Sequence, residues 1–201
     1  RTSTSRVSDA CALCKGMATM DNNRFLRLWY EVSWDHTSFD SGDALSAVQS
    51  KRRWFPYNKG GAYRRWYGNR TYLVNWENDG IELKNFIVEK YHGGSYTKEI
   101  RSERRYFQEG ITWSTLSTGP ISMRFSPEGF LFDSKGSMGF TDTHDKLLYV
   151  LAFLNSSVAQ RFLEFVAPTL DYNAGPLGLL PYEDVEGDGE IVNNCISLSR
   201  T

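Results

Sequence analysis

The chain has 201 residues, of which 40% are hydrophobic and 23% charged, and its 23 basic and 24 acidic side chains give a net charge of −1. This composition excludes collagen-like, low-complexity and intrinsically disordered chains, and the length predicts a single domain. The longest apolar run, residues 147–154, is far shorter than the roughly 20 residues that span a bilayer, so we expect no membrane segment.

In the first half of the chain, the apolar patterns predict a strand at 25–32, a helix at 43–50, strands at 54–57 and 72–76, and a helix at 79–89. A polar turn, Met20-Asp21-Asn22-Asn23, precedes the first strand. The turn-rich stretch Asn58-Lys59-Gly60-Gly61 follows the second strand and is predicted to be a flexible loop.

In the second half, strands at 121–125 and 130–132 are predicted to form a hairpin through the turn Ser126-Pro127-Glu128-Gly129. Two helices follow at 145–154 and 157–166, and a capping box between Ser157 and Gln160 is expected to open the second. We place the core at about 15–182 and interpret 183–201 as an acidic and then polar tail. Strands and helices mixed without a βαβ repeat predict an α+β fold.

Cysteine usage bears on the compartment. Three cysteines are too few to stabilise a domain of this size by disulfide bonds, which indicates a reducing, cytoplasmic environment. Cys11 and Cys14 lack the second pair of ligands that a structural zinc site needs, so ordinary thiols are favoured. The chain begins with an arginine and a Ser/Thr-rich stretch instead of a secretory signal, and we expect it to derive from a longer cytoplasmic protein.

The charges are unevenly distributed. Residues 51–70 include seven basic and no acidic side chains, whereas 183–190 include five acidic and no basic ones. Eight aromatic rings are interleaved with the basic residues between Trp54 and Trp76. Basic side chains neutralise phosphates and rings stack on bases, so this stretch favours contact with DNA or RNA over a purely structural role.

The usual catalytic motifs are absent. The sequence has no nucleophile elbow, phosphate-binding loop or dinucleotide fingerprint. None of its six prolines is adjacent to another, which excludes the Asn-Pro-Pro-aromatic loop of amino-methyltransferases. Glu82-Leu83-Lys84 resembles part of a metal-dependent nuclease site, but a solvated helix face is the favoured interpretation. We therefore predict no catalytic residue and no metal ligand in this chain.

An ordered set of short motifs extends over roughly residues 15–182. They are Trp54-Phe55-Pro56-Tyr57-Asn58-Lys59-Gly60-Gly61, Trp66-Tyr67-Gly68-Asn69, Val74-Asn75-Trp76-Glu77-Asn78-Asp79-Gly80, Gly110-Ile111-Thr112-Trp113, Gly129-Phe130-Leu131-Phe132-Asp133, Phe153-Leu154-Asn155-Ser156, Pro168-Thr169 and Leu180-Pro181. In order and spacing they resemble the C-terminal part of the PglX-type adenine-specific DNA methyltransferases of BREX phage-defence systems. The resemblance extends more loosely to the Taq-type target-recognition domains of restriction-modification enzymes.

The resemblance implies that catalysis and DNA recognition belong to different domains. Catalysis and S-adenosylmethionine binding would lie in an upstream domain absent from this chain, and this chain would recognise double-stranded DNA without needing a cofactor. Its expected partners are DNA, the catalytic domain and other defence-system proteins. Gly16, Thr19, Asp21, Asn22 and Phe25 match the family's recognition loop. Met20 replaces the usual glycine of that loop, and we do not expect a methionine to adopt the positive φ available to glycine.

Candidate DNA contacts follow from base and phosphate chemistry. Arg and Lys suit guanine, and Asn suits adenine, so the expected base-reading residues are Asn58, Lys59, Arg64, Arg65, Asn69 and Arg70. The expected phosphate contacts are Arg52, Arg53, Arg101, Arg104 and Arg105, and Arg24 completes the set. A structural alternative is that Glu99 and Glu103 pair with Arg101–Arg105 along a helix.

Two other function classes stay open. One is a protein-interaction module that docks other defence components, whose binding would be insensitive to salt. The other, less favoured, is a metal-dependent nuclease fragment that uses Glu82 and Lys84.

Overall fold

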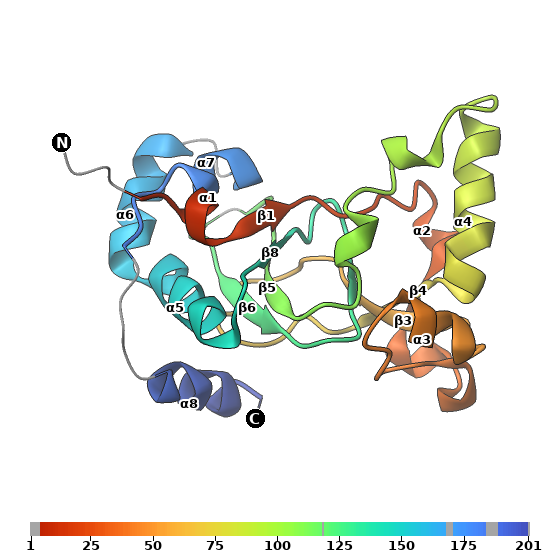
Figure 1. The fold of residues 1–201 in the computed structure, drawn as a ribbon, viewed down its shortest axis with the longest axis horizontal. Coiled ribbons are helices and arrows are strands. Elements are labelled where there is room, and N and C mark those ends of the chain that lie inside the picture. Colours follow the sequence, from red (N-terminus) through yellow and green to blue (C-terminus); the bar gives the residue numbers. More distant parts are fainter. Residues whose placement is uncertain (1–4, 118, 168–170, 184–188, 201) are drawn as a thin grey trace.

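The computed structural model describes residues 5–117, 119–167, 171–183 and 189–200. Within these residues, the strands form two four-stranded sheets (Figure 1). Sheet A has the order β1 (Ala12–Cys14), β8 (Met138–Phe140), β5 (Gly110–Trp113), β6 (Met123–Ser126), all antiparallel. Sheet B has the order β2 (Leu26–Leu28), β4 (Tyr72–Asn75), β3 (Trp54–Asn58), β7 (Leu131–Phe132), with only β3 and β7 parallel. The predicted α+β class is confirmed.

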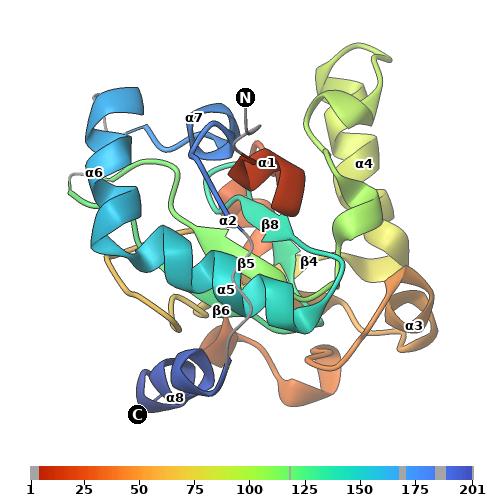
Figure 2. The same cartoon turned by 60° about the vertical axis from the view of Figure 1, so that its left-hand side comes forward.

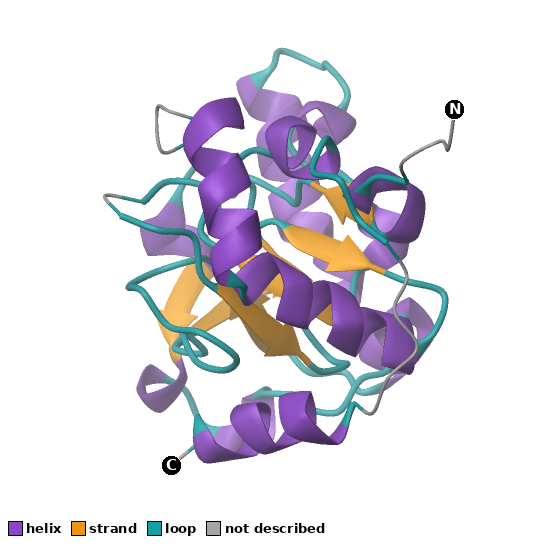
Figure 3. Ribbon diagram, turned by 90° about the vertical axis from the view of Figure 1, so that its left-hand side faces the viewer, coloured by secondary structure: helices purple, strands orange, loops and turns teal. Residues whose placement is uncertain are grey.

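Helices cover one face of sheet A and enclose the first hydrophobic core. Helix α5 (His144–Asn155) contacts β5 and β6, and α1 (Val7–Ala10), α6 (Ser157–Val166), α7 (Ala174–Gly178) and α8 (Glu190–Leu198) pack around it (Figure 3). Trp113 is fully buried there and donates its indole N–H to the carbonyl of Tyr172 at 2.7 Å. Trp113 is therefore part of the core and does not present its ring to a ligand.

A second core surrounds sheet B, on the side of the molecule away from α5 and α6 (Figure 2). It includes Phe55, Trp76, Tyr106, Phe107 and Phe132. The helices of this half are α2 (Asn22–Phe25), α3 (Ala44–Gln49) and α4 (Glu77–Lys90), with short 3₁₀ turns η1 (Trp29–Glu31), η2 (Trp34–His36), η3 (Tyr96–Lys98) and η4 (Glu103–Arg105).

The predicted hairpin at 121–132 is wrong. Strand β6 pairs with β5 in sheet A, whereas β7 pairs with β3 in sheet B. Between them, Phe107 exchanges backbone hydrogen bonds with Gly129 and Phe130, both at 2.9 Å. Gly129 has φ +91°, so it directs the chain from one sheet to the other instead of folding it back on β6.

The first predicted strand is much shorter than 25–32, because local caps compete with its β-prone sequence. The Asp21 carboxylate accepts from the Arg24 N–H and caps α2, which ends at Phe25. The Glu31 carboxylate accepts from the Leu28 N–H at 2.7 Å and holds η1. Strand β2 keeps only the three residues between these two caps.

The expected tail is partly helical. Residues 184–188, which include most of the acidic stretch, lie outside the described residues. The residues after them form α8, which packs on α5 and buries Val192 and Ile196, an i, i+4 pair that the sequence interpretation missed. The predicted bounds of α6 are confirmed, but its N-cap is not Ser157: the Ser156 hydroxyl accepts from the Ala159 N–H at 3.1 Å.

Helix α4 begins with a left-handed segment. Asn78, Asp79 and Gly80 have φ of 50°, 60° and 69°, and a Cβ on Gly80 would lie 2.6 Å from the Trp76 ring. The close approach of backbone to indole therefore requires glycine at position 80. Among the described residues, no helix is long and apolar enough to cross a membrane.

We predict that Gly80→Ala destabilises the chain more than Gly93→Ala. Gly93 also has positive φ, +89°, but a Cβ there would meet nothing within 4 Å. Gly93→Ala should cost about 1 kcal/mol from the backbone alone, and Gly80→Ala about 2 to 4 kcal/mol because overpacking adds to it. Urea unfolding midpoints measure both, and equal losses would contradict the role assigned to Trp76.

Candidate nucleic-acid interface

Three consecutive side chains at the end of β3 hold it to its surroundings, and one of them, Asn58, reaches sheet A. Tyr57 and Lys59 donate to the same carboxylate oxygen of Asp133, at 2.9 and 3.1 Å. Asn58 donates to Ser126 Oγ at 2.8 Å and is only 4% exposed. The base-reading role expected of Asn58 therefore needs correction, because its amide is used inside the fold and does not reach the surface.

The loop that follows β3 is held to its surroundings, and the expectation that it is flexible is not met. The Ser114 hydroxyl bonds both the N–H and the carbonyl of Gly61, at 2.9 and 3.0 Å. Trp66 exchanges backbone hydrogen bonds with Met123 and Phe125 of β6, both at 2.8 Å. Asn69 donates to the Ala62 carbonyl at 2.8 Å and closes the loop on itself.

The arginines of this loop differ in accessibility. Arg64 is exposed, and its backbone N–H is tied to Ser122 Oγ. Arg65 is half-buried with its guanidinium 5.7 Å from the Tyr63 ring centre, and its Nε has no hydrogen-bond partner within the described residues. Arg64 is thus the best placed of the loop residues to meet a ligand.

Arg70 has an internal role. Its guanidinium lies 3.7 Å from the centre of the Tyr67 ring and donates to the Tyr67 hydroxyl and the Phe125 carbonyl. Burial lowers the pKa of Arg70 to about 10, which still leaves it protonated at neutral pH. Unlike Asn58, Arg70 is only partly buried, so its expected base contact stays a prediction, although its guanidinium is already hydrogen-bonded within the fold.

Two of the expected phosphate contacts share one acidic partner, which offsets one of their two positive charges. Arg24 and Arg53 both form salt bridges with Glu82, at 3.0 and 3.3 Å. Burial raises the pKa of Glu82, but hydrogen bonds from Arg24 and Asn75 and the charges of both arginines outweigh it and lower the pKa below its usual value. Arg52, by contrast, is half-buried with no carboxylate within 4.0 Å among the described residues.

The arginines at 101–105 keep their charge available. They do not lie on one helix, because η3 and η4 are separate short turns. Glu99 accepts from the Tyr91 hydroxyl, and Glu103 forms a salt bridge with Lys84. The structural alternative, in which these two acids pair with the arginines, is therefore not what the fold contains.

Four hollows adjoin one another through shared lining residues, and the last of them lies at these arginines. The first and second share Asn22 and Lys59, the second and third share Ala18 and Ser134, and the third and fourth share Arg101. We call this set of hollows the cationic groove, and its basic residues are Lys15, Arg27, Lys59, Lys98, Arg101, Arg104 and Arg105. Among the described residues, Lys59 is the only one of these seven with a carboxylate within 4.0 Å.

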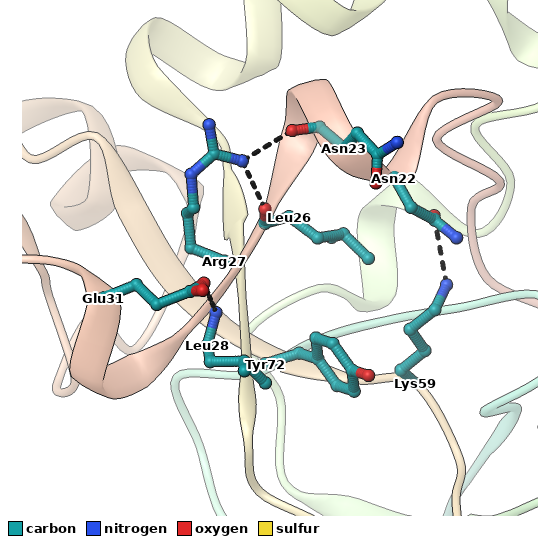
Figure 4. A pocket seen from close by; sticks show the side chains of 8 residues that line it. All are labelled: Asn22, Asn23, Leu26, Arg27, Leu28, Glu31, Lys59 and Tyr72. Carbon is teal, nitrogen blue, oxygen red and sulfur yellow. Dashed lines mark hydrogen bonds between the residues drawn. The ribbon is translucent and has the colours of Figure 1, made fainter.

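The groove contains residues that the sequence analysis did not select. In the first hollow, Arg27 donates to the carbonyls of Asn23 and Leu26, and Lys59 reaches Asn22 Oδ1 at 3.2 Å (Figure 4). Four of its basic residues, Lys59, Arg101, Arg104 and Arg105, were expected DNA contacts, whereas Lys15, Arg27 and Lys98 were not.

The structure offers no support for metal chemistry. Within the described residues, no three His, Cys, Asp or Glu side chains lie close enough together to hold a metal ion. Glu82 and Lys84 are each engaged by other side chains, Arg24 and Arg53 for the first, Asp79 and Glu103 for the second. Burial raises the pKa of the Cys11 thiol to about 12, so it stays protonated and is a poor ligand.

Comparison with known proteins finds two relatives that are several times longer than this chain. The chain is 41% identical over 201 residues to the adenine-specific methyltransferase PglX of Lacticaseibacillus casei (strain Zhang), covering 97% of this chain and 16% of the relative. It is 42% identical over 178 residues to the adenine-specific methyltransferase BrxX of Escherichia coli O9:H4 (strain HS), covering 88% of this chain and 13% of that protein. Both relatives are adenine-specific methyltransferases. This chain thus matches about one sixth or less of their length, and no family model matches it.

Met20, which the resemblance placed in the family's recognition loop, provides a stability test. It adopts φ 58°, contrary to the expectation from its side chain, and is exposed. Because an L-residue in this region is strained, Met20→Gly should stabilise the chain by roughly 1 kcal/mol. Met20→Ala is the control, since it shortens the side chain and keeps the strain. An equal urea midpoint for the glycine and alanine variants would contradict this conformation.

Proposed function

We propose that this chain is the noncatalytic DNA sequence-recognition domain of a site-specific N6-adenine DNA methyltransferase in a phage-defence or restriction-modification system. The observation that carries the proposal is the cationic groove, whose basic residues are mostly without acidic partners. The similarity to adenine-specific methyltransferases supports DNA as the ligand. In a molecule with net charge −1, such a concentration of positive charge favours a polyanion.

In this proposal the remaining functions belong to the rest of a longer protein. A catalytic domain elsewhere in that protein would hold S-adenosylmethionine and the target adenine. The chain's own partners would be double-stranded DNA, that catalytic domain and other defence-system proteins.

A protein-interaction module is the second candidate, and helix α6 favours it. Val158, Phe162, Phe165 and Val166 are all exposed on this helix, which lies on the side of sheet A and not along the groove. Binding to a protein through this face would depend little on salt, whereas binding to DNA would depend on it strongly.

We predict that duplex DNA binds the chain with a strong salt dependence. If four to seven phosphates are neutralised, log K should fall with log salt at a slope of about −4 to −6. Arg104→Ala should weaken binding and make the slope less steep by about 1, because Arg104 is exposed in the groove and has no carboxylate within 4.0 Å among the described residues. Fluorescence anisotropy over a salt series measures both, and adding S-adenosylmethionine should change neither.

The matched control is Arg161→Ala, which removes the same charge from an exposed residue on α6 that pairs with Glu164. The slope of log K against log salt for Arg161→Ala should equal that of the unmodified chain. Binding that is insensitive to salt, or an equal effect of the two variants, would count against the groove as the DNA site.

We also predict that Arg64 affects sequence preference more than affinity. A bidentate arginine contributes roughly 1–3 kcal/mol of discrimination for guanine, whereas loss of a phosphate contact weakens all sequences alike. In a selection from a random duplex library, Arg64→Ala should therefore abolish the base preference at one position of the enriched sequences. Arg104→Ala should leave the base preference at every position unchanged. The same flattened profile from both variants would show that Arg64 contacts only phosphates.

A further inference from the structure

An aromatic pocket opens beside one end of the cationic groove. Its volume is about 540 Å³, and Tyr72 lines both this pocket and the first hollow of the groove. Pro56 and Leu73 contribute from the neighbouring strands β3 and β4 of sheet B. Trp29 and Trp34 contribute from the short turns η1 and η2. The pocket therefore adjoins the first hollow of the groove at Tyr72.

The rings at this pocket are unusually exposed for a folded chain. Trp34 is 69% exposed and Trp29 46%, and Phe39 also lines the pocket from the surface. The Trp34 and Phe39 ring centres lie 4.8 Å apart. Large aromatic side chains contribute most to stability when buried, so several exposed around one hollow indicate a binding site.

The pocket suits a flat and neutral group. Of its lining residues only Arg70 and Glu128 are charged. The Arg70 guanidinium is already hydrogen-bonded to Tyr67 and Phe125. A phosphate would therefore find no free cation inside the pocket, whereas the groove next to it offers several. A nucleobase attached to a phosphate chain has this combination of a neutral ring and adjacent charge.

We propose that the aromatic pocket holds one unstacked base of a DNA strand whose phosphates lie along the cationic groove. This inference rests on the proposed function and adds a specific ligand, an extrahelical base, to it. Stacking on aromatic side chains is tolerant of base identity, and a base that is already outside the helix does not have to be unpaired before it binds.

The test compares three short duplexes of one sequence: fully paired, with one extrahelical adenosine, and with an extrahelical abasic nucleotide. The abasic duplex has the same bulge without a base, so it controls for a preference for bent DNA. We expect the 201-residue chain to bind the adenosine bulge about tenfold more tightly than the abasic one, within the roughly 5- to 150-fold range of one base–aromatic stack.

Substitutions at the pocket test whether the preference for the adenosine bulge arises there. Trp34→Ala and Phe39→Ala should each reduce this preference towards one, while Trp34→Phe, which keeps a ring, should retain most of it. Phe165→Ala is the matched control, because it removes an exposed ring from α6, at the other end of the molecule (Figure 1). Since all three positions are exposed, folding should not be affected.

The outcomes separate the two proposals. Equal binding of the adenosine and abasic bulges, or a preference that survives Trp34→Ala, overturns the base pocket. If the paired duplex still binds and is weakened by Arg104→Ala, the proposed DNA-recognition function stands without the pocket. Failure to bind any of the three duplexes overturns both, and a protein ligand then becomes the occupant to seek.

Discussion

The position of both the loop and the groove depends on the buried carboxylate of Asp133. It accepts from Tyr57 and Lys59 at the end of β3 and from the Lys135 N–H at 2.7 Å. Burial and the Asp133 charge raise the pKa of Tyr57 well above its usual value, so the hydroxyl stays protonated and donates. With Asn58 bonded to sheet A, this junction fixes the direction in which the chain leaves sheet B. Lys59 is held at the groove by the same contacts.

Much of the fold could be predicted from local pattern, as β3, β4, α5 and α6 show. The false hairpin at 121–132 had a favourable local turn, and only a distant residue, Phe107, separates its strands. Helix α8 was missed because its apolar pair follows a run of acids that dominates the local composition. Local pattern fails in these two cases for different reasons. The contacts that place 121–132 come from residues distant in the sequence, and the apolar pair of α8 is obscured by the acidic residues before it.

The candidate site was harder to predict than the fold, and the reason is electrostatic. The stretch 51–70 has the densest basic composition, yet Glu82, a residue outside it, pairs with Arg53, and Arg70 is hydrogen-bonded within the fold. At 99–105 the acids close in sequence bond elsewhere, which leaves the arginines available. Sequence shows where charges are, but pairing in three dimensions decides which of them remain to attract a ligand.

The motifs on which the resemblance was based occupy mainly structural positions. Trp66, Asn69 and Gly80 adopt positive φ, and Asn58 and Asp133 are buried at the sheet junction. Under the proposed function, related domains would need the same scaffold but different contacts, because each parent enzyme methylates its own target sequence. Side chains such as Lys15, Lys98 and Arg104 lie outside these motifs, on short turns and strand ends. An identity of 41–42% with the two relatives therefore bears on the fold of this segment, and under the proposed function the preferred DNA sequence would depend on its own groove residues.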